Sequence, residues 1–131
     1  MSEHSTIPGL VEKLRAPIAA QIPQVKTDLA ALVALPSVHG AEPDACAEAA
    51  AMVVELLVGL AIPGIGREQI QQIETSDGST TIVAHRDASG DSPTVLLYSH
   101  YDVQPAGDPQ AWTASPWELT EREGRWYGRG A

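Results

Sequence analysis

A continuous apolar run, followed by a histidine and a carboxylate, stands in the second half of the chain as Val95-Leu96-Leu97-Tyr98-Ser99-His100-Tyr101-Asp102. An apolar run of this kind is typical of a strand that is buried on both faces of a sheet. Such a strand requires helices on both sides of the sheet to cover it. The sequence therefore predicts an α/β fold in which helices pack on a mixed β-sheet.

Two helices are expected before this strand. Residues up to about 35 place apolar side chains at helical spacing, but Pro17 and Pro23 interrupt the pattern. Proline lacks the backbone N–H that an interior helical position needs, so a break between two helical pieces is expected there. A second helix is predicted from about residue 43 to residue 60, because Pro43 suits the first turn of a helix.

Shorter strands and turns surround the apolar run. Alternating side chains predict strands at 70–75 and 80–85, joined by a hairpin turn at 76–79, and a second turn at 87–93. Charged residues that alternate between Glu118 and Arg125 predict a further hairpin with a solvated face. The three tryptophans, Trp112, Trp117 and Trp126, are expected to cap a core, with a peptide or carbohydrate platform as the alternative.

The charge balance argues against nucleic acid as a partner. Eight Lys and Arg against 17 Asp and Glu give this 131-residue chain a formal net charge of −9. Binding to phosphates requires clustered cations, which this composition lacks. The hydrophobic fraction of 44% is normal for a globular protein, and the length fits one small domain.

The sequence also predicts a cytoplasmic protein with no membrane partner. Cys46 is the single cysteine, so neither an internal disulfide nor a cysteine-based zinc knuckle is expected. The N-terminus lacks the basic and apolar regions of a signal peptide. The longest apolar stretch, residues 49–62, is interrupted by Glu55 and is shorter than the roughly 20 residues of a membrane span.

His100 and Asp102 are the candidate site residues. They follow the expected buried strand, and ligands bind beyond the carboxyl ends of strands in open α/β sheets. In extended chain, residues two apart project to the same side, so Asp102 can orient the His100 imidazole as a metal ligand. On spacing alone, a hydrogen-bonded loop histidine is the more frequent explanation, and one histidine does not hold a zinc ion.

A longer pattern resembles a known family. The segment 95–105, the motif Ser115-Pro116-Trp117 and the final Gly124-Arg125-Trp126-Tyr127-Gly128-Arg129-Gly130-Ala131 resemble the M20 metallopeptidases. The His-Tyr-Asp-Val-Gln-Pro form at 100–105 is most similar to the dipeptidase branch, which includes carnosine and nonspecific dipeptidases. The resemblance extends more weakly back to about residue 25.

The resemblance implies a metal site that this chain holds only in part. It implies a zinc-peptidase-like (phosphorylase/hydrolase-like) catalytic domain with two zinc ions, for which manganese or cobalt are alternatives. His100 would be a ligand of one ion, and Asp102 the catalytic carboxylate that orients its imidazole. The family's bridging Asp, general-base Glu and other ligands would lie beyond Ala131. Residues 1–131 would then be the N-terminal part of the catalytic domain, truncated before a lid domain through which the complete enzyme forms a homodimer.

The resemblance implies an enzyme that hydrolyses the amide bonds of dipeptides, with a small peptide as substrate. The alternative with the same machinery is an N-acyl-amino-acid deacylase or desuccinylase. A non-catalytic short binding protein is the alternative from another class. Because the resemblance places the metal-bridging Asp and the general-base Glu beyond Ala131, the 131-residue chain by itself is expected to be inactive.

The remaining candidates carry less chemistry. His85, at a strand end, is expected to be structural, and His39 and His4 to be solvated. Cys46 is expected to be an inert, buried thiol in the second helix.

Overall fold

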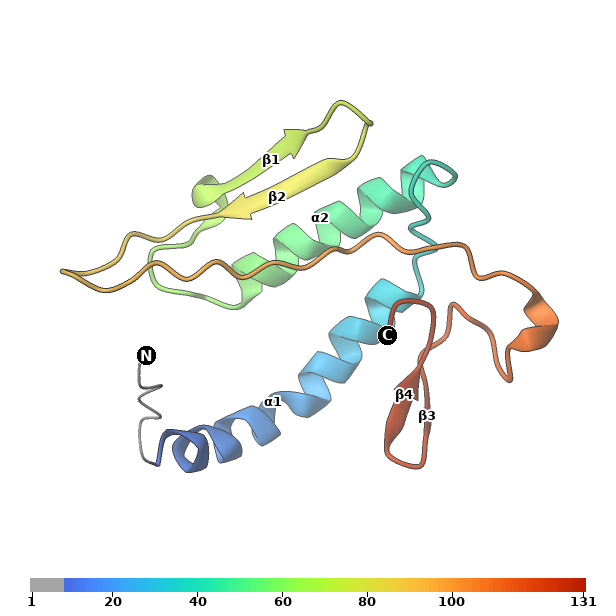
Figure 1. Ribbon diagram of the computed structural model, residues 1–131, viewed down its shortest axis with the longest axis horizontal. Helices are drawn as coiled ribbons and strands as arrows, with labels where there is room; N and C mark the ends of the chain where they lie inside the picture. The colour runs from blue at the N-terminus through green and yellow to red at the C-terminus, as the bar shows by residue number, and fades with distance from the viewer. Residues whose placement is uncertain (1–8) are drawn as a thin grey trace, which may run out of the picture.

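The computed structural model describes residues 9–131, which form two α-helices, two short 3₁₀-helices (η1 and η2) and two separate antiparallel sheets of two strands each. Figure 1 shows a long extended segment between β2 and η2, whereas the other elements are joined by shorter turns and loops. In chain order they are α1 (Leu10–Val33), α2 (Pro43–Gly59), η1 (Arg67–Gln69), β1 (Ile70–Glu74), β2 (Thr80–Ala84), η2 (Pro109–Ala111), β3 (Thr120–Arg122) and β4 (Arg125–Tyr127).

Helix α1 is continuous, so the predicted break between two helical pieces is wrong. Both Pro17 and Pro23 lie inside it. Each proline removes one backbone hydrogen bond, while the neighbouring bonds of the helix remain, and Figure 1 shows that the helix bends along its length. The hydroxyl of Thr27 also donates to the carbonyl oxygen of Pro23 at 3.1 Å.

Helix α2 forms where the sequence predicts it, and it carries much of the small core. Pro43 occupies the first turn, and Gly59 is the last helical residue. Ala49, Ala50 and Val54 are buried, and the helix packs against strand β2. Small side chains on this face allow the close approach of helix and strand. No helix within residues 9–131 is both long enough and apolar enough to cross a bilayer.

The β1–β2 hairpin also forms as predicted, with Glu74 opposite Thr80 beside the turn. In that turn the Asp77 carboxylate accepts hydrogen bonds from the Thr75 hydroxyl at 2.6 Å and from the Ser79 hydroxyl at 2.7 Å. These hydrogen bonds hold the pKa of Asp77 well below its usual value. A lowered carboxyl pKa stabilises the fold above about pH 4, and this contribution is lost as the pH falls through the folded-state value.

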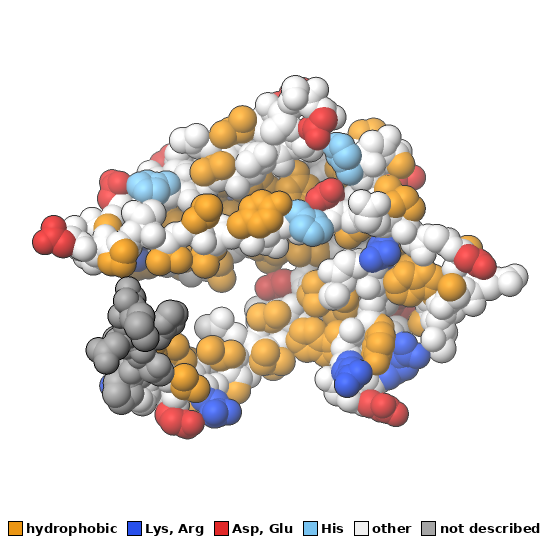
Figure 2. Space-filling view, viewed as in Figure 1, with side chains coloured by type: hydrophobic (Ala, Val, Ile, Leu, Met, Phe, Trp, Pro, Cys, Tyr) orange, Lys and Arg blue, Asp and Glu red, His pale blue; other side chains and the backbone are white. Residues whose placement is uncertain are grey.

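The apolar run at 94–98 does not form the expected buried strand, and the described residues contain no mixed sheet. Its backbone is extended without a neighbouring strand, and Val95, Leu96, Leu97 and Tyr98 are 75%, 87%, 88% and 86% exposed. Figure 2 shows apolar side chains gathered along this part of the molecule and along α1. These apolar side chains would be stabilised by burial, but no element of residues 9–131 covers them. The two helices and the small antiparallel sheets are consistent with an α/β fragment.

The turn at residues 128–130 packs closely against Val33 and Val103. Gly128 approaches Val33 so closely that a Cβ atom would lie 2.8 Å from its Cγ1. Gly130 has a φ of +85°, and a Cβ atom there would lie 2.6 Å from Cγ1 of Val103. Both values are shorter than normal carbon contacts, so this turn requires glycine.

Gly130→Ala is expected to lower the free energy of unfolding by roughly 2–5 kcal/mol, because it combines a left-handed backbone with overpacking against Val103. Gly107 is the matched control, since it has a φ of +75° and open space around its Cβ position. Gly107→Ala should cost only about 1–2 kcal/mol, from the backbone alone. Equal urea midpoints for the two variants would contradict the close approach at Gly130.

Candidate functional site

The segment that carries His100 and Asp102 is anchored by the loop after α1. Ser37 is 1% exposed, and its hydroxyl donates to the carbonyl oxygen of Tyr101 at 3.1 Å. The N–H of Val103 donates to the carbonyl oxygen of Ser37 at 2.9 Å, and Val38 and Val103 form a parallel β-bridge. These contacts fix the backbone on both sides of Asp102.

Tyr101 holds the same segment against the β1–β2 hairpin. Its phenol donates to the carbonyl oxygen of Thr80 at 2.6 Å, and burial is the main cause that raises the pKa of this phenol. Alternate residues of an extended chain point to opposite sides. Because Tyr101 points toward β2, His100 and Asp102 are free to share the other side.

The His100 imidazole lies directly against Asp102. Its Nδ1 is 2.9 Å from the backbone carbonyl oxygen of Asp102 and 3.2 Å from the carboxylate Oδ1. The His100 side chain is 71% exposed, and that of Asp102 is 45% exposed. The sequence therefore correctly indicated that the two side chains meet.

This contact determines what the imidazole can do. Both oxygens that face Nδ1 are acceptors, so the neutral ring places its proton on Nδ1 and leaves a lone pair on Nε2. A histidine oriented in this way by a carboxylate is a common arrangement for a metal ligand. Within residues 9–131, however, no group of three or more His, Cys, Asp and Glu side chains converges on one point. The described residues thus offer one oriented ligand and not a complete metal site.

The other two histidines of residues 9–131, His39 and His85, lie beside the β1–β2 hairpin. His85 repeats the same spacing with Asp87, at 3.6 Å between Nδ1 and Oδ1, but both side chains are strongly exposed. His39 lies 3.7 Å from Asp77, the turn residue described above. These contacts agree with the structural or solvated roles expected for both residues. His4 lies outside the described residues.

Two residues near Asp102 were not associated with the site by the sequence pattern. Ser37 supports the backbone from 64 positions away in the chain. Cys46, in the first turns of α2, lies near enough for the Asp102 carboxylate to affect it. Partial burial is the main cause that raises the pKa of the Cys46 thiol, and the charges of Asp102 and Glu42 add to it. No local periodicity or spacing could have revealed either proximity.

Residues 96–131 match the model of the peptidase family M20/M25/M40. The chain is also 60% identical over 57 residues to a cysteinylglycine-S-conjugate dipeptidase of Corynebacterium striatum, covering 44% of this chain and 12% of that protein. It is 36% identical over 67 residues to the β-Ala-His dipeptidase of Mus musculus, covering 51% and 14%. It is 35% identical over 82 residues to a succinyl-diaminopimelate desuccinylase of Paracidovorax citrulli, covering 60% and 21%.

These similarities define the class first: residues 96–131 are similar to a family of peptidases. They confirm the resemblance to the M20 family, and the dipeptidase relatives support the dipeptidase type within it. The matched part of the chain spans only 12% to 21% of the length of these relatives. The matches therefore cover too little of each relative to assign that relative's activity to this chain.

Ser37→Ala is expected to lower the free energy of unfolding by about 1–2 kcal/mol, because the Tyr101 carbonyl loses its donor in a partly buried place. Ser76→Ala, in the exposed hairpin turn, is the control and should change little. Urea denaturation of both variants measures the difference. Indistinguishable midpoints would show that the Ser37 hydroxyl does not support this segment.

Proposed function

We propose that this chain belongs to a metal-dependent hydrolase that cleaves the amide bonds of dipeptides. The observation that carries the proposal is the contact between Asp102 and Nδ1 of His100, inside the segment that matches the M20 peptidases. This contact leaves Nε2 as the free nitrogen of an oriented ring.

In this proposal His100 is one ligand of a metal centre, and Asp102 is the positioning residue that keeps the proton on Nδ1. Zinc is the proposed metal, with two ions in the full-length protein and manganese or cobalt as alternatives. A bound divalent ion supplies a water of lowered pKa for hydrolysis. The described residues provide one of its ligands, so the proposal requires further ligands from elsewhere in the full-length protein.

A dipeptide is the proposed substrate, because relatives named for cysteinylglycine conjugates and for β-Ala-His match this chain. The second candidate is an N-acyl amino acid. It is favoured by two matches to succinyl-diaminopimelate desuccinylases, at 41% and 35% identity. A panel of a cysteinylglycine S-conjugate, β-Ala-His and N-succinyl-diaminopimelate separates the two candidates by relative kcat/KM.

We further propose that the full-length protein is cytoplasmic and forms a homodimer through a lid domain.

His100→Ala in the full-length protein is expected to lower kcat/KM for a dipeptide by about 1,000-fold or more, because a metal ligand is lost. Asp102→Asn should reduce metal affinity or activity by about 10-fold to 100-fold, since the amide orients the ring less well. Metal content measured by mass spectrometry should fall together with activity.

The matched control is the other His-x-Asp pair of the chain. His85→Ala and Asp87→Asn change the same residue types at the same spacing, on the exposed end of the hairpin. Both variants should keep the activity and the metal content of the unaltered protein. An equal loss in both pairs, or full activity of His100→Ala with the metal retained, would contradict the assigned roles.

The purified 131-residue chain by itself is expected to show no dipeptide turnover with added zinc, manganese or cobalt. The reason is chemical, because residues 9–131 bring together no group of three ligands and zinc requires about four. The measurement is a ninhydrin or chromatographic assay of dipeptide cleavage. Metal-dependent turnover that disappears in His100→Ala would overturn this expectation.

A further inference from the structure

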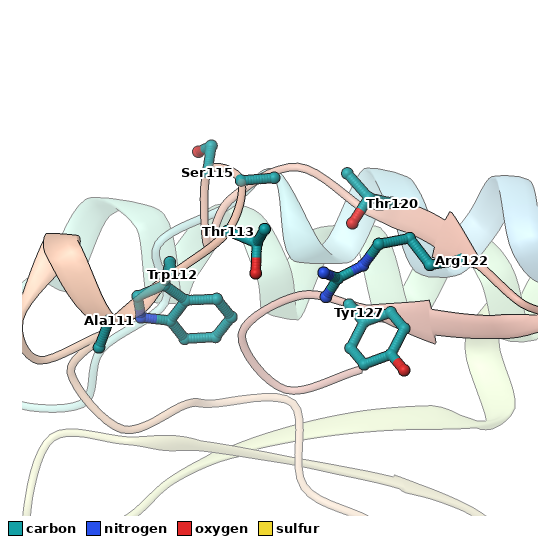
Figure 3. Close-up of a pocket in the computed structure, with 8 residues that line it drawn as sticks. Ala111, Trp112, Thr113, Ser115, Thr120, Arg122 and Tyr127 are labelled. Carbon is teal, nitrogen blue, oxygen red and sulfur yellow. The ribbon is translucent and has the colours of Figure 1, made fainter.

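A shallow depression lies between the turn at η2 and the β3–β4 hairpin, with a volume of about 210 Å³. Figure 3 shows the side chains that border it. They include Trp112, Thr113 and Ser115 from the loop after η2, and Thr120, Arg122 and Tyr127 from the hairpin. At about 30 Å³ per water molecule, this space corresponds to roughly seven waters, which is the size of a single small organic molecule.

Arg122 is the charged residue that borders this depression, and, like Arg125 and Arg129, it pairs with no carboxylate of residues 9–131. Lys26 pairs with Glu121, and Arg67 pairs with Glu55 at 2.7 Å. Within residues 9–131, no carboxylate oxygen lies within ion-pair distance of Arg122. In a chain with a net charge of −9, a cation without a carboxylate beside it is available to an external anion.

Aromatic rings hold this cation and shape the space in front of it. The Arg122 guanidinium lies over the ring of Tyr127, 4.2 Å from its centroid. Across the depression, the Trp112 indole donates from Nε1 to the carbonyl oxygen of Ala106 at 2.8 Å, so its ring is fixed. The Arg129 guanidinium lies over the same ring, 5.9 Å from its centroid.

The polar groups face the gap between these rings. Figure 3 shows the Thr113 hydroxyl between the Trp112 indole and the Arg122 guanidinium. A guanidinium offers two parallel N–H donors that match the two oxygens of a carboxylate, and a hydroxyl adds a third donor. A flat apolar group attached to the carboxylate would meet the face or edge of the indole.

We propose that this depression binds a small organic carboxylate with a flat apolar group. The Arg122 guanidinium binds the carboxylate, the Thr113 hydroxyl adds a hydrogen bond, and Trp112 packs against the apolar part. The fork of one guanidinium matches the two oxygens of a carboxylate, and the indole offers a face to its apolar group. The proposal does not depend on the proposed peptidase activity, because it uses none of the residues assigned to hydrolysis.

The test is a titration of the full-length protein with benzoate, followed by the NMR resonance of the Trp112 indole N–H. Benzamide, which has the same shape without the charge, is the matched ligand. Benzoate should shift this resonance saturably and bind at least about 10-fold more tightly than benzamide. Arg122→Gln should weaken benzoate binding by about 10-fold to 100-fold, and Arg122→Lys by less, because a lysine keeps the charge without the fork.

Arg125→Gln is the matched control variant. Arg125 lies on the same hairpin, directly opposite Arg122, and does not border the depression. This variant should bind benzoate as the unaltered protein does. Equal weakening by Arg125→Gln, equal affinity for benzamide, or no shift of the Trp112 resonance would overturn the proposal. Inorganic phosphate that displaces benzoate at lower concentration would also overturn it, in favour of a general anion site.

Discussion

The close approach of the loop after α1 to the backbone around Asp102 is the contact on which the rest of the structure depends. Ser37 donates from its hydroxyl to Tyr101 and accepts from the N–H of Val103. The last turn of the chain closes over this contact, since Gly130 leaves no space for a side chain beside Val103. Buried backbone groups must be paired, so these hydrogen bonds join segments that are far apart in the sequence.

The chemistry of the candidate site follows from this anchoring. With Tyr101 turned toward Thr80, the alternation of an extended chain leaves His100 and Asp102 on the opposite side. The carboxylate and carbonyl oxygens of Asp102 then fix the proton of the imidazole on Nδ1. A backbone contact thus controls which nitrogen is free, although none of the anchoring groups is itself a ligand.

The exposed run at 94–98 is the opposite case, because its sequence favours a β-strand but no neighbouring strand of residues 9–131 pairs with it. Its side chains are strongly apolar, and the backbone is already extended. A strand is stabilised by hydrogen bonds to its neighbours and by burial of its faces. Neither is available to this run within residues 9–131, and its hydrophobic side chains remain in contact with solvent.

Elements that depend on residues close together in the chain could be predicted from the sequence, and contacts between distant segments could not. Helix α2, the β1–β2 hairpin and the meeting of His100 with Asp102 were predicted correctly, because each depends on residues close in the chain. The continuity of α1 was not, because the other hydrogen bonds of a long helix outweigh two interruptions by proline. Only the tertiary structure decided that the run at 94–98 stays unpaired within residues 9–131, that Ser37 supports the site and that Trp112 and Arg122 border one depression. Each of these depends on which segments meet in space, and no local pattern encodes that.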